Sequence, residues 1–291
     1  MQQDYLIRAT ALNGKVRAFA ANITGILEEL RARHKTSPVA TAALGRTLAA
    51  AAMMGAMLKG EEKLTIQVKG NGPIGQIVVE ANADGDLRGY VDDPSVELPL
   101  NGKGKLDVAG AVGTEGFIYI IKDLGLREPY RGSTPIVSGE LGEDFTYYFA
   151  KSEQTPSAVA LGVLVDTDRT VRTSGGFIIQ LMPGLAEEEI AELEARLSGL
   201  PPITTMLDQG LSLEAILNEV LEDVQVKERM DLQFRCKCSQ ERVEQTLISL
   251  GRDELEDMIA RNEPAEVVCH FCNETYRFDT EHLQALLERA L

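Results

Sequence analysis

The four cysteines of this 291-residue chain all lie near its C-terminal end. They form two short motifs: C-x-C at Cys236 and Cys238, and, thirty residues further on, C-x-x-C at Cys269 and Cys272. Two turns that each offer two thiolates match the tetrahedral sulfur coordination that Zn²⁺ prefers. The pattern therefore predicts a four-thiolate zinc site, with one zinc ion per chain in the reduced protein.

The three histidines are the other side chains that could complete such a site. His270 lies between the cysteines of the second motif, but four thiolates already fill a tetrahedral site, so we predict a turn residue there. His34 and His282 lie in predicted helices and are expected on the surface. The chain also has no nucleophile-elbow or P-loop motif, so we predict no catalytic residues and no enzymatic activity.

Zinc-bound cysteines are thiolates, the form that peroxide and hypochlorous acid attack. A disulfide within C-x-C would close a strained ring, and strained disulfides are readily reduced again. Zinc contributes on the order of 10–16 kcal/mol to the folding of a small domain, as much as the whole stability of a typical domain, about 5–15 kcal/mol. Oxidation that releases the metal is therefore expected to unfold the segment that holds the cysteines.

Sequence patterns divide the chain into three segments. Residues 1–182 mix strand and helix patterns, which predicts an α+β domain with a mostly antiparallel sheet. Residues 183–230 are predicted to form a helical, metastable linker. Residues 231–291 are predicted to form a small α+β zinc-binding domain that acts as a redox switch and has few large apolar side chains for a core.

The linker carries 11 acidic and 3 basic residues, a net charge of −8. Its helices are amphipathic, with Ile190, Leu193 and Leu197 on one apolar stripe. Such a stripe has to be buried, most simply against the sheet of the first domain. Because the charges repel one another, we expect the folded linker to be only marginally stable, and its release would expose apolar, protein-binding surface.

The longest apolar run is LAAAAMMGAML, residues 48–58. It is too short to span a bilayer, so we predict a packed helix that is capped by Ser37, has Pro38 at its first position and extends to about Leu58. Met53, Met54 and Met57 could form an adaptable surface for binding other proteins, but core packing is the preferred interpretation.

Charge and targeting signals bear on localisation and partners. The net charge is −16, and residues 183–291 hold 24 acidic and 10 basic residues. Such a region repels phosphate, so no nucleic acid is expected as a partner. The start, MQQDYLIRAT, lacks the order of a secretory signal, and clustered thiols suit a reducing compartment. We expect a cytoplasmic protein that does not bind membranes.

These residues resemble a known family. The arrangement of C-x-C, thirty residues and C-x-x-C is similar to that of the bacterial redox-regulated holdase chaperones, the heat-shock proteins of thirty-three kilodaltons. The segment SGELGEDFTYYFAKSEQTPSAVALGV, Ser138 to Val163, looks like the most recognisable stretch of that family. The resemblance covers the whole chain.

The resemblance implies an ATP-independent holdase that is inactive while it is reduced and zinc-bound. It also implies that the N-terminal domain, residues 1–182, carries much of the client-binding surface. Oxidation would link Cys236 to Cys238 and Cys269 to Cys272, release zinc, unfold the linker and favour an active homodimer that binds unfolding client proteins. The absence of a G-x-x-x-x-G-K-[ST] motif agrees with binding that needs no ATP.

The acidic residues of the recognisable segment have two interpretations. Glu140, Glu143, Asp144 and Glu153 could act as paired carboxylates. We favour a helix with a solvated acidic face and a packing side formed by 147–149.

Three other functions are considered. A zinc-ribbon protein that binds nucleic acid would need a basic face, whereas residues 231–291 carry 13 acidic and 7 basic residues. A thiol-disulfide oxidoreductase would place C-x-x-C at the start of a helix after a strand, whereas here the motif lies in a predicted turn between two strands. A purely structural zinc domain on an unknown enzyme is the third.

Overall fold

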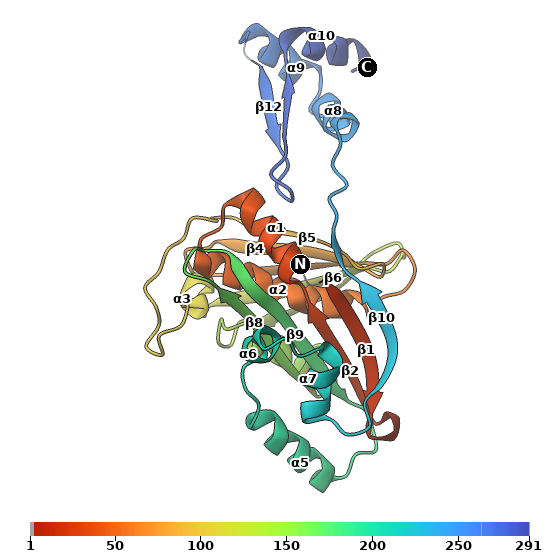
Figure 1. The fold of residues 1–291 in the computed structure, drawn as a ribbon. Helices are drawn as coiled ribbons and strands as arrows, with labels where there is room; N and C mark the ends of the chain where they lie inside the picture. Colours follow the sequence, from red (N-terminus) through yellow and green to blue (C-terminus); the bar gives the residue numbers. More distant parts are fainter. Residues whose placement is uncertain (1–2, 263, 291) are drawn as a thin grey trace. The chain divides into compact units, whose positions relative to one another are not determined.

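The structure, a computed structural model, describes residues 3–262 and 264–290. The chain forms two compact units, Met1–Arg235 and Cys236–Leu291 (Figure 1). Within the described residues, no helix is both long and apolar enough to cross a membrane.

Two sheets form the frame of the first unit, and nearly all their strand pairs are antiparallel, which confirms the predicted α+β class. The five-stranded sheet has the order β10-β1-β2-β9-β8, and the six-stranded sheet has the order β11-β5-β4-β3-β6-β7. Their bounds are β1 Tyr5–Ala11, β2 Val16–Asn22, β8 Ser157–Val165, β9 Val171–Leu181 and β10 Gln225–Asp231, then β3 Lys63–Gly70, β4 Gln76–Asn82, β5 Asp86–Val91, β6 Gly116–Asp123, β7 Tyr130–Pro135 and β11 Gln233–Phe234.

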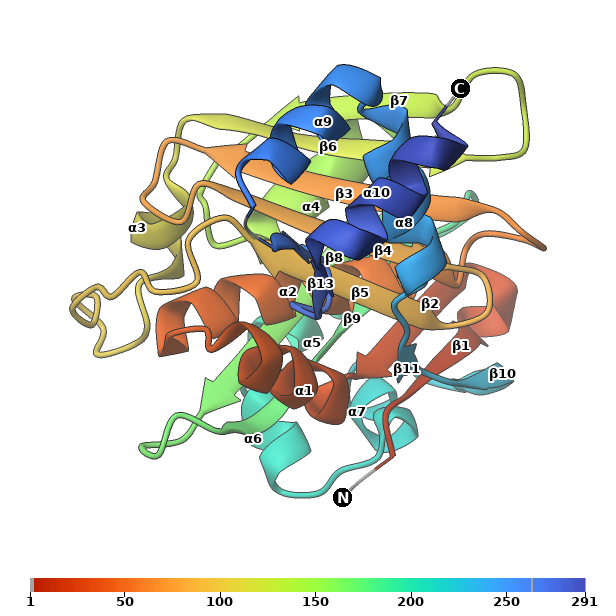
Figure 2. The same ribbon diagram turned by 90° about the horizontal axis from the view of Figure 1, so that it is seen from above.

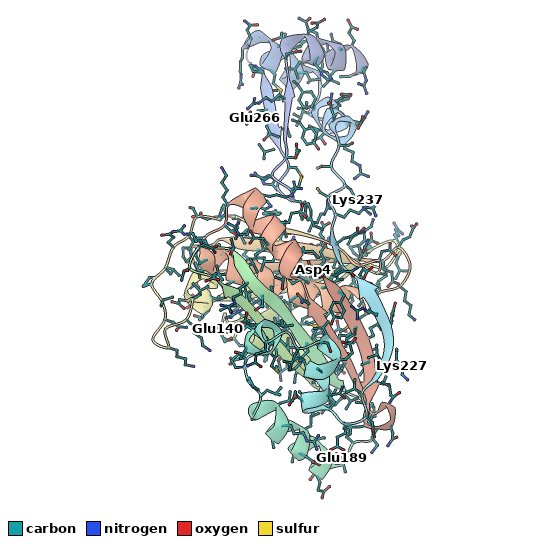
Figure 3. All side chains as sticks on the ribbon, in the orientation of Figure 1. Asp4, Glu140, Glu189, Lys227, Lys237 and Glu266 are labelled. Atoms are coloured by element: carbon teal, nitrogen blue, oxygen red, sulfur yellow. The ribbon has the colours of Figure 1, made fainter. Side chains whose placement is uncertain are left out.

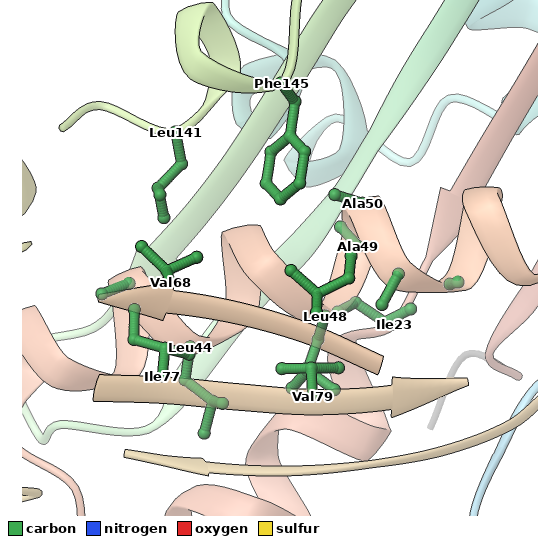
Figure 4. Packing of buried hydrophobic residues seen from close by; sticks show 14 of the residues in the cluster. Ile23, Leu44, Leu48, Ala49, Ala50, Val68, Ile77, Val79, Leu141 and Phe145 are labelled. Carbon is green, nitrogen blue, oxygen red and sulfur yellow. The ribbon is translucent and has the colours of Figure 1, made fainter. Parts of the chain in front are cut away.

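Helix α2 (Pro38–Gly55) lies between the two sheets, with α1 (Thr24–His34) beside it (Figure 2). Of its 18 residues, 16 are buried, which agrees with the apolar residues on nearly every side of the helix; Arg46 is the charged exception. The Ser37 hydroxyl accepts a hydrogen bond from the backbone N–H of Ala40, as the predicted cap requires. The helix packs Leu48 near Val79 of the six-stranded sheet (Figure 4).

The methionines at the end of α2 are part of this core. Met53 is fully buried and Met54 nearly so, while Met57 packs against the cluster from a partly buried position. The prediction of core packing is confirmed for Met53 and Met54.

Helices α5 (Glu187–Ser198), α6 (Ile203–Asp208) and α7 (Leu213–Val220) form a second apolar cluster with the other face of the five-stranded sheet. α6 packs on β8 and β9, and α7 on β1 and β2. The cluster joins nine buried residues of the sheet to nine of the helical segment: Tyr5, Ile7, Ala9, Ala11, Val16, Ala18, Ala20, Phe177 and Ile179 with Leu193, Ile203, Met206, Leu207, Leu213, Ile216, Leu217, Val220 and Leu221. The amphipathic helices thus bury their apolar stripe as their pattern predicts.

A glycine of β8 makes the close approach of α6 possible. A Cβ atom added at Gly162 would lie 2.6 Å from Cγ2 of Ile203 and 2.7 Å from Cγ2 of Thr204. The missing side chain therefore allows α6 to lie directly against the strand.

The segment expected to be helical through residue 230 ends differently. α7 ends at Val220, and β10 follows as an edge strand paired with β1. Six of its seven residues are exposed, so it lacks the apolar alternation that identifies strands and is held mainly by backbone pairing. β11 then pairs in parallel with β5, and so the first unit extends to Arg235.

The recognisable segment contains α4 (Gly142–Lys151), and not all of its carboxylates face solvent. Asp144 is fully buried: its oxygens accept hydrogen bonds from the backbone N–H groups of Val137 (2.7 Å), Ser138 (2.9 Å) and Leu141 (2.8 Å). The carboxylate thereby holds a loop in which Leu141 has φ of 69°, a conformation that costs energy for a leucine. The expectation of a solvated acidic face is wrong for Asp144.

Two other carboxylates of the segment form ion pairs. Glu140 pairs with Nη1 of Arg46 at 2.6 Å (Figure 3). Glu153 accepts from Nζ of Lys122 and from the hydroxyl of Tyr148, both at 2.6 Å. Glu143 is exposed, as expected. These carboxylates fix α4 to its surroundings, and Tyr148 and Phe149 are buried as predicted, while Tyr147 stays partly exposed.

The second unit is a β-hairpin with three helices. Its core of buried residues is small: Leu247, Leu255, Phe278, Leu283, Leu286 and Ala290. Its elements are α8 Gln240–Ser249, α9 Arg252–Ala260, β12 Ala265–Val268, β13 Thr275–Phe278 and α10 Thr280–Arg289. The first unit has two further short elements, η1 Leu12–Gly14 and α3 Val108–Val112. So few buried side chains give little stability to a unit of this size.

Candidate metal centre

Each cysteine motif lies at the end of a strand. Cys236 and Cys238 follow β11 and precede α8, whose first turn is capped by the Ser239 hydroxyl. Cys269 and Cys272 lie in the turn between β12 and β13. The second unit thus brings together two loops that are thirty residues apart in sequence.

Hydrogen bonds to the backbone shape both loops. The N–H of Cys269 donates to the carbonyl of Glu274 (2.9 Å), and the N–H of Asn273 donates back to the carbonyl of Cys269 (2.8 Å). Asn273 has φ of 58°, a left-handed conformation that asparagine tolerates well. In the first loop, Nη1 of Arg242 donates to the carbonyl of Lys237 (2.8 Å), and the Lys237 side chain is exposed (Figure 3). These hydrogen bonds hold both loops without a contribution from a metal ion.

The four sulfur atoms all lie within 4.8 Å of one another. Sγ of Cys236 is 3.7 Å from Sγ of Cys269, and Sγ of Cys238 is 3.2 Å from Sγ of Cys272. A tetrahedral zinc–thiolate centre with metal–sulfur bonds of about 2.3 Å has sulfur–sulfur separations of roughly 3.8 Å. The four cysteines, which are free thiols in this structure, can therefore hold a metal ion.

The electrostatics of the cluster favour a bound cation. The pKa of Cys236 is lowered to about 7: burial acts against this shift, and hydrogen bonds from the Cys238 backbone and from the other thiols outweigh it. Burial raises the pKa of Cys238 and of Cys272. One thiolate thus forms readily, but further thiolates are opposed by burial and mutual repulsion, which a divalent cation offsets.

The histidines take other positions. His270 is exposed and is not a member of the group that can hold a metal among the described residues. His34 is the last residue of α1 and is partly exposed. His282 links two helices: Nε2 lies 3.0 Å from a carboxylate oxygen of Glu244, and its ring packs edge-on against Phe278. The expectation of a plain surface residue is therefore wrong for His282.

Tyr276 also lies beside the thiol cluster, and the spacing of the cysteines does not predict this neighbour. Its hydroxyl lies 3.2 Å from Sγ of Cys238 and donates to it. A tyrosine four residues after Cys272, on the strand that leaves the turn, is the available sequence signal.

Comparison with known proteins agrees with this arrangement. The model of one family, described as Hsp33 protein, matches residues 4–279. The chain belongs to the Hsp33 family. Hsp33 relatives that are each called 33 kDa chaperonin include those of Bacillus cytotoxicus (57% identity over 288 residues) and Brevibacillus brevis (57% over 286 residues), and each match covers 98% of this chain and 99% of the relative.

A solved structure supports the Hsp33 fold. The 33 kDa chaperonin of Thermotoga maritima matches with a TM-score of 0.92 and 38% sequence identity, over 99% of both chains. The resemblance identified from the cysteine spacing and from residues 138–163 is confirmed, and the names of the relatives support a chaperone role.

Proposed function

We propose that this Hsp33 protein is a redox-regulated, ATP-independent holdase chaperone rather than an enzyme. In the reduced state it holds one zinc ion and is inactive. Oxidation releases the zinc, frees the helical linker and exposes a surface that binds unfolding proteins. The observation that carries the proposal is the order of elements along the chain. The helices α5 to α7 cover an apolar face of the five-stranded sheet, the short strands β10 and β11 follow them, and the four-thiol cluster begins directly after β11.

Cys236, Cys238, Cys269 and Cys272 would hold the zinc ion. The metal neutralises four clustered thiolates and joins two loops of a unit with a small core. The protein supplies preformed loops, in which backbone bonds to Cys269 and the Arg242–Lys237 contact place the sulfurs.

The oxidised state has disulfides Cys236–Cys238 and Cys269–Cys272. Each forms from two thiolates, which give two electrons to a peroxide; with two protons the peroxide leaves as two molecules of water. Cysteines paired within each motif no longer link the two loops, so the second unit loses the connection that supplements its core.

Unfolding passes to the linker through the chain itself. Cys236 follows Arg235, whose N–H donates to the carbonyl of Leu87 (3.0 Å), and β11 is only two residues long. β10, the next strand back, is an edge strand with six exposed residues. Apart from Met230, Leu232 and Phe234, which pack into the main core, little apolar surface holds this stretch, so both strands detach more readily than the central strands once the second unit is disordered.

The helices α5, α6 and α7 precede these strands, and their release uncovers the apolar face of β1, β2 and β9. That face includes Tyr5, Ile7, Val16, Phe177 and Ile179. A contiguous apolar surface of this kind binds the exposed apolar segments of unfolding proteins. The same surface on a second copy would support the active homodimer, and the protein would act in the cytoplasm on clients rather than on nucleic acid or membranes.

The position of the C-x-x-C motif argues against a thiol-disulfide oxidoreductase. It lies in the turn of a β-hairpin and does not begin a helix. The zinc-ribbon alternative stays disfavoured because residues 231–291 carry 13 acidic and 7 basic residues.

The test combines zinc release with holdase activity. The protein is treated with peroxide in the presence of a chromogenic chelator and then mixed with a thermally unfolding client, whose aggregation is followed by light scattering. We expect about one zinc ion released per chain and suppression of aggregation only after oxidation. Equal suppression by reduced and oxidised protein, or none by either, would contradict the switch.

A further inference from the structure

Tyr276 connects the thiol cluster to the small core of the second unit. It lies on β13, paired with Val267 of β12, and its ring packs against the core cluster from a partly buried position. Its hydroxyl reaches Sγ of Cys238 at 3.2 Å, although the two residues are 38 positions apart in sequence. One side chain thus joins the hairpin to the opposite cysteine loop.

The chemistry of this contact has a direction. A phenol hydroxyl donates and a thiolate sulfur accepts, so the bond is strongest when Cys238 is a thiolate, as it is when it binds a metal. The bond fixes the sulfur in the cluster and draws electron density from it. A sulfur with less available electron density is a weaker nucleophile toward a peroxide.

We propose that Tyr276 is a positioning residue, which holds Cys238 in the geometry of a metal ligand and slows the oxidation of this cysteine. The inference rests on the proposed four-thiolate centre and deepens it. It makes the oxidation threshold of the switch depend on a residue that is neither a ligand nor a cysteine. Groups that hydrogen-bond to metal ligands commonly change metal affinity by 10- to 100-fold when they are removed.

The test uses Tyr276→Phe in the full chain, a change that keeps the ring in the core and removes the hydroxyl. The matched control is Tyr147→Phe, the same change on α4 of the first unit. Zinc affinity is measured by competition with a chelator. We expect it to fall about tenfold for Tyr276→Phe and to stay unchanged for the control.

A second measurement separates positioning from a general loss of structure. The proteins receive less peroxide than they have thiols, and mass spectrometry after differential alkylation gives the oxidised fraction of each cysteine. Oxidation of Cys238 relative to Cys269 should rise roughly fivefold in Tyr276→Phe, the factor that corresponds to one net hydrogen bond. A general loosening would raise oxidation of all four cysteines together.

Two further measurements test the same contact, and the second keeps the proposal open to refutation even if Tyr276→Phe folds poorly. With Co²⁺ in place of zinc, the sulfur-to-metal charge-transfer band should shift to lower energy in Tyr276→Phe. In addition, 3-fluorotyrosine at position 276, a stronger donor, should lower the relative oxidation of Cys238.

The outcomes distinguish a failure of the proposed zinc site from a failure of the proposed role of Tyr276. If the wild-type protein binds no zinc through its thiols, the proposed function itself fails. If the wild-type protein binds zinc, but Tyr276→Phe has the same affinity, band position and cysteine ratio, only the role of Tyr276 is overturned.

Discussion

Leu217 is the side chain whose truncation tests most directly whether the linker helices conceal the active surface. It is fully buried in the cluster between α7 and the five-stranded sheet. The backbone N–H of Leu213, at the start of the same helix, donates to the hydroxyl of Tyr5 on β1 (3.1 Å). Leu217→Ala leaves that anchor in place and removes apolar contact from the middle of the docked face.

The expected cost is about 3 kcal/mol, because a fully buried leucine is replaced by alanine and the cavity closes only in part. If the loss acts on the docked state alone, the undocked fraction of the linker rises roughly a hundredfold. The reduced, zinc-loaded variant should then bind an apolar dye, lose protease resistance in residues 183–230 and suppress client aggregation without oxidation. Ile216→Val, which costs about 1 kcal/mol, should give a smaller effect in the same direction.

Glu219→Ala is the matched control, since it puts the same residue on the exposed face of α7. Zinc content and circular dichroism are measured in parallel, so that unfolding of either unit is detected. The reasoning is refuted if Leu217→Ala keeps its zinc and its fold but has the dye binding, protease resistance and inactivity of the wild-type protein.

Three more predictions follow from the first unit. Asp144→Asn should lower the free energy of unfolding in urea by about 2–3 kcal/mol, because the amide group must face a buried N–H donor; exposed Glu143→Gln should change it by under about 0.5 kcal/mol, and equal effects would contradict this role. Gly162→Ala should displace α6 and make the linker protease-sensitive in the reduced protein, whereas Gly102→Ala, where a Cβ meets nothing within 4 Å, should not. Burial raises the pKa of Glu153, but hydrogen bonds from a lysine and a tyrosine outweigh it, so the pKa is lowered. The ionised carboxylate therefore stabilises the fold above its unfolded pKa of about 4.3, and this stabilisation is lost as the pH falls through the lower folded pKa. Glu153→Gln should therefore cost about 2 kcal/mol at pH 7 and progressively less below about pH 4, and a difference independent of pH would count against the ionised pair.

Much of the frame is predictable from local sequence. Ser37 and Pro38 mark the start of α2, and the apolar residues that follow on every side indicate a helix buried all round. The cysteine spacing predicts the cluster, because two short motifs in turns can meet only if the strands and helices between them fold back. The apolar stripe around Leu193 predicts that the linker packs on a sheet.

The missed elements lack local signals. β10 is specified by its pairing with β1, and its exposed residues show no apolar alternation, whereas a strand leading into the first cysteine motif is predicted and is present as β11. Asp144 is acidic in a helix with other acids, so sequence alone favours solvent; its burial depends on a loop whose N–H groups converge on it in three dimensions. Tyr276 was missed for the same reason, because its partner sulfur lies across the hairpin. Assigning separate roles to residues 1–182, 183–230 and 231–291 stays a prediction.

The position of α2 between two sheets also has a consequence for biosynthesis. The helix ends at Gly55, but the strand β9 that helps to enclose it ends at Leu181, so the ribosome adds roughly 125 more residues before the enclosure can close. At typical elongation rates this takes on the order of 6 to 25 s, during which a largely apolar helix is exposed on the nascent chain. A protein proposed to shield unfolded chains thus passes through a stage in which it needs the same shielding.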